Sequence, residues 1–562
     1  MQTIVQKESP EPPSFPLARF WGGLLWLLPM LVYGWFFDQY AINIPKYDDH
    51  ALRVFLVNLE KAGSLHDKIY ELFRQHNEHR IVLDRFFSWL DFRLTGKLNY
   101  VHLMVLGNLS LVLLFLVFLR ALRKAGAAVW MALPVSLLLF NLSQWENMLW
   151  GMAALQNFTV MALAIATFYE LAFKNRVGWL AILLPVLATI TSGNGLLIWP
   201  VGLLMLFFRQ DYAGVLRWLA ALAITFRLYF LGYEKPAGNP VDQGSVLDQL
   251  HGWILFNGAA GEALPLANGL ISSLLIGLVV IGLTATIALP ALWRFFRGHK
   301  LTDWQLFFWG GAVFIAGTGL VVAINRVGFG LETLITSRYK IYSLTLLAFV
   351  ISYWIATSPP HRRWRAALAG TVFSFFICFF SYGTYLDRVY YLRQFLTTYQ
   401  FNYTYTQPRP VSTIDPETRR MIDTAPAFYD SHLPALFERS KTASALRLDT
   451  LYKSNDVYTI RVDSFPVLGL REEGAYVIAR SPHRVYLFST QQSLSGSRRR
   501  WLQLRQTFRP GFTAHIPETD LDRGTYDLQI LAVGPNSQWR FFNTDRQITS
   551  SGKPSVQIQK NW

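Results

Sequence analysis

Long apolar runs are the feature that most constrains the fold of this chain. Most of them approach the roughly 20 residues that an α-helix needs to cross a bilayer core of about 30 Å. Three runs are shorter, and residues 178–208 read equally well as one broken hairpin. The runs predict a polytopic α-helical membrane protein with about eleven transmembrane helices. The predicted spans are 17–37, 99–120, 127–143, 153–173, 178–192, 195–208, 215–232, 266–293, 304–324, 339–357 and 366–384.

The composition of the chain agrees with a membrane protein. Only 16% of its 562 residues are charged and 52% are hydrophobic, whereas soluble proteins contain about 25% charged residues. The net charge of +16 does not indicate a nucleic-acid partner, because the basic residues stand in short clusters between apolar runs. A single cysteine, Cys378, excludes an intramolecular disulfide and a cysteine-based zinc site.

The basic clusters predict the orientation of the chain in the membrane. If the N-terminus is inside, the cytoplasmic segments hold most of the Lys and Arg residues that flank the spans, and the short outer loops hold few. Residues 38–98 and everything after about 385 then lie outside. The predicted location is the bacterial inner membrane, with a cytoplasmic N-terminus and a periplasmic C-terminal domain.

Changes in composition predict the domain organisation. Residues 1–16, rich in Pro and Glu, are expected to be disordered and cytoplasmic. Residues 17–384 form the transmembrane module, and 385–440 form a partly helical linker. Apolar and polar residues then alternate, as in Val457–Val462, between turns rich in Gly, Pro, Asn and Asp. Residues 441–562 are therefore predicted to form a periplasmic β-rich domain resembling a β-sandwich.

The first outer loop, residues 38–98, carries the most polar chemistry. Asp48 and Asp49 follow the first span directly. Two stretches, about 50–74 and 79–94, then place apolar residues at helical spacing with charges on the opposite face. We predict that both are helices lying on the membrane surface.

This layout resembles the GT-C superfamily of membrane glycosyltransferases, of the protein mannosyltransferase and lipid A aminoarabinose transferase type. The resemblance covers roughly residues 15–385 and rests on the topology together with the acidic pair Asp48 and Asp49. It implies an enzyme that moves a sugar from a polyprenyl-phosphate-linked donor to a hydroxyl of a lipid, glycan or protein acceptor. Membrane lipids are further expected partners.

Asp48 is the expected general base and Asp49 the reserve. Attack on an anomeric carbon requires a base that takes the proton of the acceptor hydroxyl, and a carboxylate at the membrane interface suits that role. The alternative is structural: either aspartate caps the helix predicted to begin at His50.

Arginines at the outer face are expected to bind the leaving phosphate. Guanidinium groups stabilise its developing charge, and Arg80, Arg326 and Arg338 are the candidates. Arg338 and Tyr339 open a predicted span, as such a pair does in several such transferases, although snorkelling at a helix end explains them equally. Arg227 lies within a predicted span, where it is either functional or paired with a nearby acid or carbonyl group.

The junction between the two surface stretches offers further ligands. Glu78, His79 and Arg80 are predicted to contact the sugar, the phosphate or each other. His50, His76 and His79, with the two aspartates, are also candidate ligands of a divalent cation. The spacing does not decide whether a metal is bound, and no other cofactor is expected.

Two more outer turns are predicted to line a cavity. One contains Glu146 between Trp145 and Trp150, and the other contains Asn194. Irregular backbone at membrane depth is tolerated where it lines a wet cavity. The tryptophans suit stacking on a sugar face, but they also suit the ordinary interfacial anchor.

Three other classes of protein remain alternatives. A polysaccharide polymerase or ligase is the nearest, although most of the polar candidate residues of this chain lie in the first outer loop rather than in a large late one. A lipid-glycan transporter or flippase is the second, although no internal repeat is evident. A non-catalytic assembly factor is the third. No phosphate-binding Gly-rich loop or dinucleotide fingerprint supports an ATP-driven pump or a nucleotide-sugar enzyme.

Overall fold

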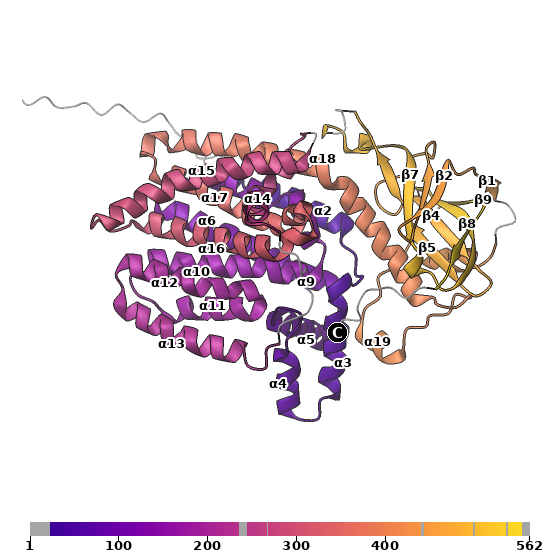
Figure 1. Ribbon diagram of the computed structural model, residues 1–562, viewed down its shortest axis with the longest axis horizontal. Coiled ribbons are helices and arrows are strands. Elements are labelled where there is room, and N and C mark those ends of the chain that lie inside the picture. Colours follow the sequence, from indigo (N-terminus) through magenta and orange to yellow (C-terminus); the bar gives the residue numbers. More distant parts are fainter. Residues whose placement is uncertain are drawn as a thin grey trace, which may run out of the picture.

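The computed structural model describes residues 23–234, 244–266, 268–439, 443–497, 501–535 and 538–552. The segment 1–16, predicted to be disordered, lies outside them. The described chain is mostly helical up to residue 436 and forms a β-rich domain after it (Figure 1). The helices are α2 (Leu27–Tyr40), α3 (His50–Lys61), α4 (Leu65–Phe73), α5 (Val82–Thr95), α6 (Tyr100–Lys124), α7 (Leu133–Leu139), α8 (Trp145–Met148), α9 (Gly151–Ala153), α10 (Thr159–Phe173), α11 (Trp179–Thr191), α12 (Ile198–Arg209), α13 (Tyr212–Tyr229), α14 (Val246–Asn257), α15 (Gly269–Phe296), α16 (Asp303–Arg326), α17 (Lys340–Thr357), α18 (Arg363–Thr404) and α19 (Pro416–Met421).

Within the described residues, six helices are long and apolar enough to cross a membrane. Three shorter apolar helices lie at Val129–Leu139, Trp179–Thr191 and Gly193–Arg209. The membrane-like helical character is therefore confirmed, and the number of eleven spans stays a prediction. The six candidates are Tyr100–Lys124, Gly151–Phe173, Gly269–Phe296, Asp303–Phe329, Ser337–Thr357 and Pro360–Thr404.

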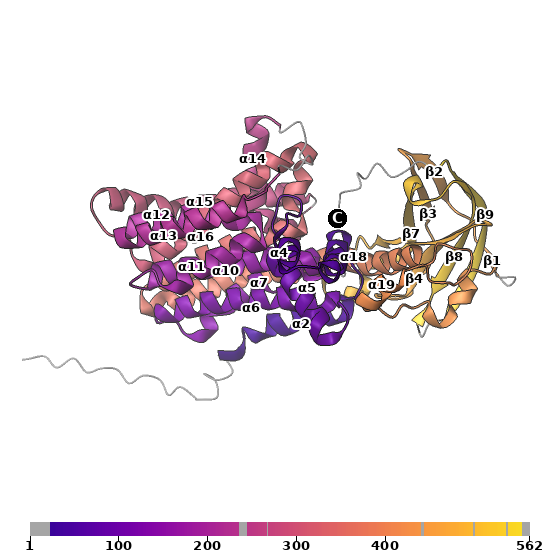
Figure 2. The same cartoon turned by 90° about the horizontal axis from the view of Figure 1, so that it is seen from below.

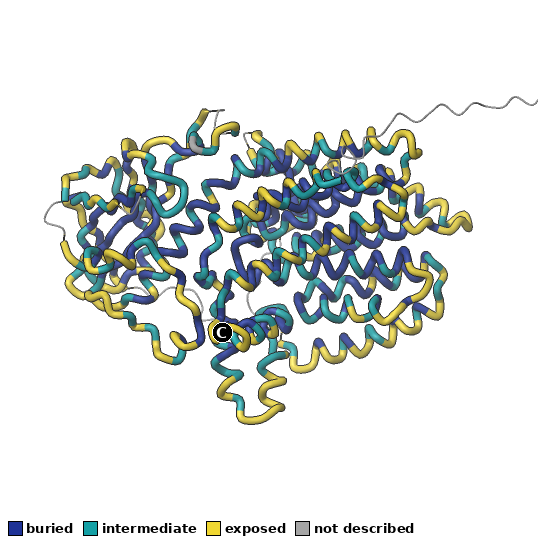
Figure 3. The backbone as a smooth tube through the Cα atoms, turned by 180° about the vertical axis from the view of Figure 1, so that it is seen from behind, coloured by how far each residue is buried: buried dark blue, intermediate teal, exposed yellow. Residues whose placement is uncertain are grey.

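Helix α17 forms the centre of the helical body and α15 its edge. In the most apolar window of each, 83% of the α17 residues are buried but only 28% of the α15 residues. Helices α7, α16 and α18 pack around α17, and Figure 3 shows buried residues concentrated in this interior. Apolar side chains of α15 such as Leu275, Val279 and Leu289 are exposed, as expected of a helix that faces lipid.

Helix α14 was not predicted from the sequence. Its 12 residues are too few to span a bilayer, and they lie in the outer loop predicted between the spans 215–232 and 266–293. Ser245 caps its N-terminus, with the Ser245 side chain accepting a hydrogen bond from the Asp248 amide. The helix packs against α15 and α16 and continues into a 3₁₀ turn, η6 (Ala259–Ala263).

The first loop contains helices where the sequence predicts them, but three rather than two. Residues 50–74 form α3 and α4, which are separated at residues 62–64, and Ser64 caps α4 by accepting a hydrogen bond from the Asp67 amide. Helices α3 and α4 project from the helical body as a hairpin (Figure 1). Every residue of α4 keeps some solvent exposure, which agrees with an amphipathic surface helix.

Helix α18 is much longer than the span predicted at 366–384. It runs without a break for 42 residues, or about 63 Å at 1.5 Å per residue. That length is roughly twice a bilayer core of about 30 Å. The second half of α18 therefore forms residues 385–404 of the predicted, partly helical linker, and both Figure 1 and Figure 2 show it leading into the β-rich domain.

The C-terminal β-rich domain consists of two sheets, which confirms the predicted β-rich region. One sheet has the order β1-β9-β8-β4-β5 and the other β2-β3-β7-β6. Apolar side chains of both sheets, including Ile460, Val477, Phe512 and Ile530, form one buried core. The strands are β1 (Ser444–Ala445), β2 (Thr450–Ser454), β3 (Val457–Val462), β4 (Gly474–Arg480), β5 (Val485–Ser489), β6 (Gln491–Leu494), β7 (Phe508–Pro517), β8 (Gly524–Val533) and β9 (Trp539–Ser550).

Polar contacts fix the β-rich domain on the helices. Arg393 of α18 forms an ion pair with Glu472. The Tyr390 hydroxyl donates to the Glu473 carbonyl oxygen over 2.6 Å, and the Tyr40 hydroxyl of α2 donates to that of Leu470 over 2.9 Å. The segment before β4 is thus held against α18 and α2.

A close backbone approach between α14 and α15 gives a test of this packing. A Cβ atom on Gly277 would lie 2.2 Å from the Ile254 carbonyl oxygen, whereas one on Gly282 of the same helix would meet no atom within 4 Å. We expect Gly277→Val to destabilise the protein by about 1–3 kcal/mol because the helices must separate. The folded fraction left after heating in detergent, measured by size-exclusion chromatography, reports it.

Gly282→Val is the matched control, since it makes the same change in the same helix without a steric clash. Equal melting temperatures for the two variants would contradict the α14–α15 contact.

Candidate functional site

Asp49 is fully buried and joins two backbone segments. Its Oδ2 accepts a hydrogen bond from the Lys46 amide over 3.0 Å, and its Oδ1 accepts one from the Met152 amide over 2.9 Å. Burial raises the pKa of Asp49 to about 7, although the two amide donors lower it in part. Asp49 thus anchors the loop after α2 to the start of α9, and it does not cap α3.

Asp48 differs from its neighbour because it is only partly buried. It lies in a single 3₁₀ turn, η1 (Tyr47–Asp49), that directly precedes α3. Tyr47 in this turn has a left-handed φ of 45° and is 57% exposed. Of the two aspartates, Asp48 therefore retains the access that a general base needs.

A buried ion pair lies beside the aspartates. Lys46 is only 4% exposed, and its Nζ lies 3.1 Å from Oε1 of Glu146. The same Nζ lies 4.7 Å from the ring centroid of Trp150 and 5.5 Å from that of Trp145. Burial lowers the pKa of Lys46. Burial alone would raise the pKa of Glu146, but Lys46 and Arg338 outweigh it and hold this pKa below its usual value.

Arg338 joins this ion pair from a different part of the chain. Its Nε lies 3.7 Å from Oε2 of Glu146, and its guanidinium carbon lies 5.4 Å from the Trp150 ring. The side chain is 41% exposed, yet its Nε is buried and donates no hydrogen bond within the described residues. Part of the Arg338 side chain is therefore open to a ligand, whereas its Nε faces Glu146 in the interior.

Hydrogen bonds between two turns bring Glu146 and Arg338 together. The Ser337 Oγ accepts from the Glu146 amide over 3.1 Å and donates to the Ser143 carbonyl oxygen over 2.8 Å. The Asn147 side-chain amide donates to the Arg338 carbonyl oxygen over 3.1 Å. The turn before α17 is thereby held against α8.

A second buried ion pair continues the site toward α18. Lys340 is 1% exposed and pairs with Glu262. Glu262 also accepts a hydrogen bond from the Tyr385 hydroxyl over 2.9 Å. Lys46, Lys340 and Glu262 are not among the residues predicted from the sequence, although charged residues beside apolar runs are a general signal for such sites.

Four of the predicted residues meet in a separate cluster around the first loop. Arg326 lies 3.5 Å from Glu78. The Nδ1 of His79 accepts a hydrogen bond from the Gly193 amide over 3.2 Å. The next residue, Asn194, donates to the Tyr342 hydroxyl over 3.0 Å and accepts from the Thr318 hydroxyl over 2.9 Å. The turn at Asn194 thus contacts α16 and α17.

The Tyr339 ring connects the two regions through apolar contact. Its centroid lies 5.6 Å from that of Phe256 in α14, and the Phe256 centroid lies 5.3 Å from that of Tyr342. The Tyr339 side chain therefore extends from the turn that contains Arg338 and packs against the side of α14.

Two of the predicted arginines occupy other surroundings. Each guanidinium nitrogen of Arg80 donates to a backbone carbonyl oxygen, and the three acceptors belong to Phe73, Tyr229 and Leu231. This arrangement favours a structural role for Arg80 over the predicted phosphate contact. Arg227 lies on the exposed face of α13.

The residues predicted as metal ligands are not assembled into a metal site. The Nε2 of His50 lies 3.0 Å from the Tyr399 hydroxyl. His76 and His79 exchange backbone hydrogen bonds with each other. Within the part of the chain that the structure describes, no group of three or more His, Cys, Asp or Glu side chains is placed to hold a metal ion. The divalent cation therefore has no support from this geometry.

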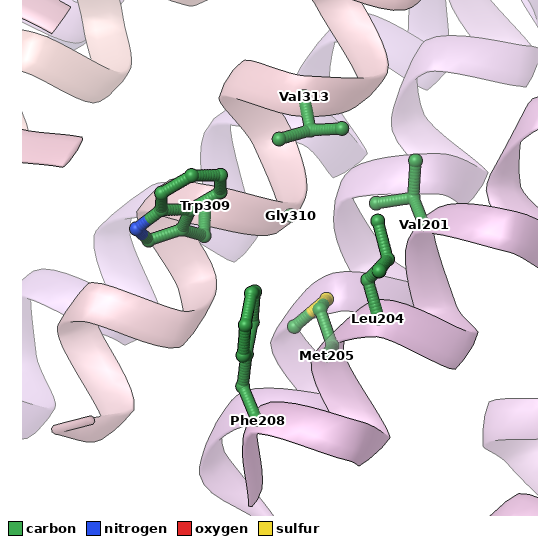
Figure 4. A pocket seen from close by; sticks show the side chains of 7 residues that line it. All are labelled: Val201, Leu204, Met205, Phe208, Trp309, Gly310 and Val313. Atoms are coloured by element: carbon green, nitrogen blue, oxygen red, sulfur yellow. The ribbon is translucent and has the colours of Figure 1, made fainter. Parts of the chain in front are cut away.

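A small apolar pocket lies elsewhere, between α12 and α16 (Figure 4). Its lining consists of apolar residues and one glycine, and it includes none of the candidate site residues. It offers no group for catalysis. The lining residues are Val201, Leu204, Met205, Phe208, Trp309, Gly310 and Val313.

Comparison with protein-family models, curated proteins and solved structures gave no significant match to this chain. The function must therefore be argued from the site itself.

The buried Asp49 gives a prediction on pH. An Asp side chain in an unfolded chain has a pKa of about 4, whereas Asp49 in the folded protein has a pKa of about 7. Between these values the folded protein retains a proton that the unfolded chain loses, so this contribution to stability falls as the pH rises. We expect the melting temperature of wild type minus that of Asp49→Asn to be larger at about pH 5 than at about pH 8.

Asp48→Asn is the control and should keep the wild-type trend, because Asp49 is intact in it. A difference between wild type and Asp49→Asn that is constant with pH would show that Asp49 is ionised throughout.

Proposed function

We propose that this protein is a membrane glycosyltransferase of the GT-C type that moves a sugar from a polyprenyl-phosphate-linked donor to an acceptor hydroxyl. One observation carries the proposal. The guanidinium of Arg338, with a buried Nε that donates no hydrogen bond within the described residues, lies over Trp150 and beside Glu146 and Lys46. A guanidinium whose side chain is 41% exposed and that is braced by a carboxylate and an indole ring suits a phosphate.

The proposed chemistry is a single displacement at the anomeric carbon. Asp48 takes the proton of the acceptor hydroxyl as the acceptor oxygen bonds to that carbon. The bond between the carbon and the phosphate oxygen breaks, and its electron pair leaves with the lipid phosphate. Arg338 stabilises the negative charge that forms there. Glu146 orients Arg338 and is in turn neutralised by Lys46.

The position of the site supports a transferase over a transporter. Asp48 follows α2, Glu146 lies between α7 and α10, and Arg338 precedes α17, so all three stand at helix ends. An interfacial site suits a donor whose lipid stays in the bilayer, whereas transporters place their charged sites near the midplane.

The proposal includes the orientation derived from the basic clusters. The N-terminus is cytoplasmic in the bacterial inner membrane, and the β-rich domain and the site are periplasmic. A polysaccharide polymerase or ligase and a lipid-glycan flippase are the competing functions, and the experiments below separate them.

Asp48→Asn tests the proposed base. We expect sugar transfer by the purified protein in lipid nanodiscs, with a radiolabelled polyprenyl-phosphate sugar as donor, to fall at least about 100-fold, because general base catalysis contributes about 10²–10⁴ in rate. Asp38→Asn is the matched control, since Asp38 is exposed at the nearby end of α2. Both variants should melt as the wild type does.

Full transfer by Asp48→Asn would refute the assignment of the base. Movement of a lipid-linked glycan across proteoliposomes without cleavage of the donor would instead establish the flippase alternative.

Arg338→Lys tests the phosphate contact. Lysine keeps the positive charge but lacks the planar pair of donors. A hydrogen bond to a charged group contributes about 1.5–3 kcal/mol, so we expect the donor KM to rise about 10-fold or more. Arg326→Lys is the comparison, because Arg326 is paired with Glu78 in the separate cluster. A larger effect at Arg326 than at Arg338 would move the phosphate site to that cluster.

A further inference from the structure

Four aromatic side chains form a row along the second half of α18. They are Tyr391, Phe395, Tyr399 and Tyr403, each four residues after the last, and we call them the aromatic row. Neighbouring ring centroids lie 6.1, 6.4 and 6.3 Å apart, and the ring planes are inclined by 29°, 25° and 15°. Twelve residues of helix separate the first ring from the last, which is about 18 Å. The row is therefore longer than any monosaccharide.

The aromatic row is open to a ligand. Tyr399 is 37% exposed and Tyr403 is 39% exposed, and the other two rings are partly exposed. Large exposed aromatic residues are expected where α18 lies in lipid, but this half of the helix packs beside the β-rich domain. Contact with the membrane interior therefore does not explain the exposure of these rings, and a different ligand is needed to cover them.

The aromatic row lies beside the candidate site. The ring centroid of His50, the residue after Asp49, lies 5.9 Å from that of Tyr399 and 5.8 Å from that of Tyr403. The Tyr47 ring centroid lies 5.8 Å from that of Trp150, with the planes at 69°. Trp150 in turn contacts Lys46 and Arg338. The exposed ring of Tyr47 thus lies beside the buried Trp150, which contacts the proposed phosphate-binding arginine.

Polar groups border the aromatic row on both sides. The Nε2 of His50 lies 3.0 Å from the Tyr399 hydroxyl, and Arg53 donates to the Tyr403 hydroxyl over 2.6 Å. On the side of the β-rich domain, Asp520 lies within electrostatic range of Tyr399. Tyr399 and Tyr403 therefore combine an apolar ring face with a hydrogen-bonding edge.

We propose that the aromatic row binds the acceptor as an oligosaccharide chain, with the end that receives the new sugar at Tyr47 and Asp48. This inference rests on the proposed function. A saccharide presents C–H faces to aromatic rings and hydroxyl groups to polar edges, and so matches the row in both respects. A lipid chain would leave the tyrosine hydroxyls, Arg53 and Asp520 facing hydrocarbon, which is costly.

Binding without any donor tests the proposal. The full chain in nanodiscs is titrated with cellohexaose, mannohexaose and chitohexaose, and with the three corresponding monosaccharides, by isothermal calorimetry and saturation-transfer NMR. We expect at least one hexasaccharide to bind at least 10-fold more tightly than its monosaccharide, because it contacts several rings. The double variant Tyr399→Ala/Tyr403→Ala should weaken that binding at least 10-fold.

Two control variants separate the aromatic row from general effects. The double variant Tyr399→Phe/Tyr403→Phe keeps the rings and should retain most of the binding. Tyr452→Ala removes an exposed tyrosine of β2, which is 52% exposed, and should change nothing. Failure of all three hexasaccharides to bind, or equal binding by the double alanine variant, would overturn the proposal, as would binding of anionic lipid vesicles in competition with the sugars.

The result also distinguishes this inference from the proposed function. Hexasaccharide binding that depends on the row, in a protein that transfers no sugar, would support the row and refute the transferase. Sugar transfer that is unchanged in the double alanine variant would support the transferase and refute the row.

Discussion

The buried ion pair between Lys46 and Glu146 is the interaction on which the candidate site depends. Removing one partner of such a pair leaves an uncompensated charge in the interior, which costs about 3–5 kcal/mol. The pair connects the loop after α2 to the turn before α10, and Glu146 in turn holds Arg338. Three segments far apart in the chain therefore take their relative positions from one carboxylate.

Backbone hydrogen bonds complete the same junction. Asp49 accepts from the amides of Lys46 and Met152, and Ser337 connects the Glu146 amide to the Ser143 carbonyl oxygen. These groups lie at helix ends, where backbone donors and acceptors have no partner within their own helix. Because such groups are costly to bury unpaired, a site built from helix ends requires side chains that satisfy them. Asp49 has this structural task, whereas Asp48 is only partly buried.

Helix α18 relates the helical body to the β-rich domain. Its first half packs with α7 and α17, and its second half contacts β5 and the segment before β4. One continuous helix limits the freedom of the domain relative to the site far more than a flexible linker would. In the proposed transferase, this rigidity fixes the aromatic row beside His50, two residues after Asp48.

The sequence by itself determined most of the elements of this protein, although not α14, because apolar runs of helical length and alternating strands are local patterns. The helical region, the helices of the first loop and the β-rich domain all follow from such patterns. The same patterns single out Asp48, Glu146 and Arg338 as candidate site residues, because they are polar groups beside apolar runs. Only the tertiary structure decided which of them meet. Arg80 is held by carbonyl oxygens of Phe73, Tyr229 and Leu231, and Lys46, unremarkable in the sequence, pairs with a residue 100 positions away. Such pairings arise from burial and geometry across helices, which no local pattern records.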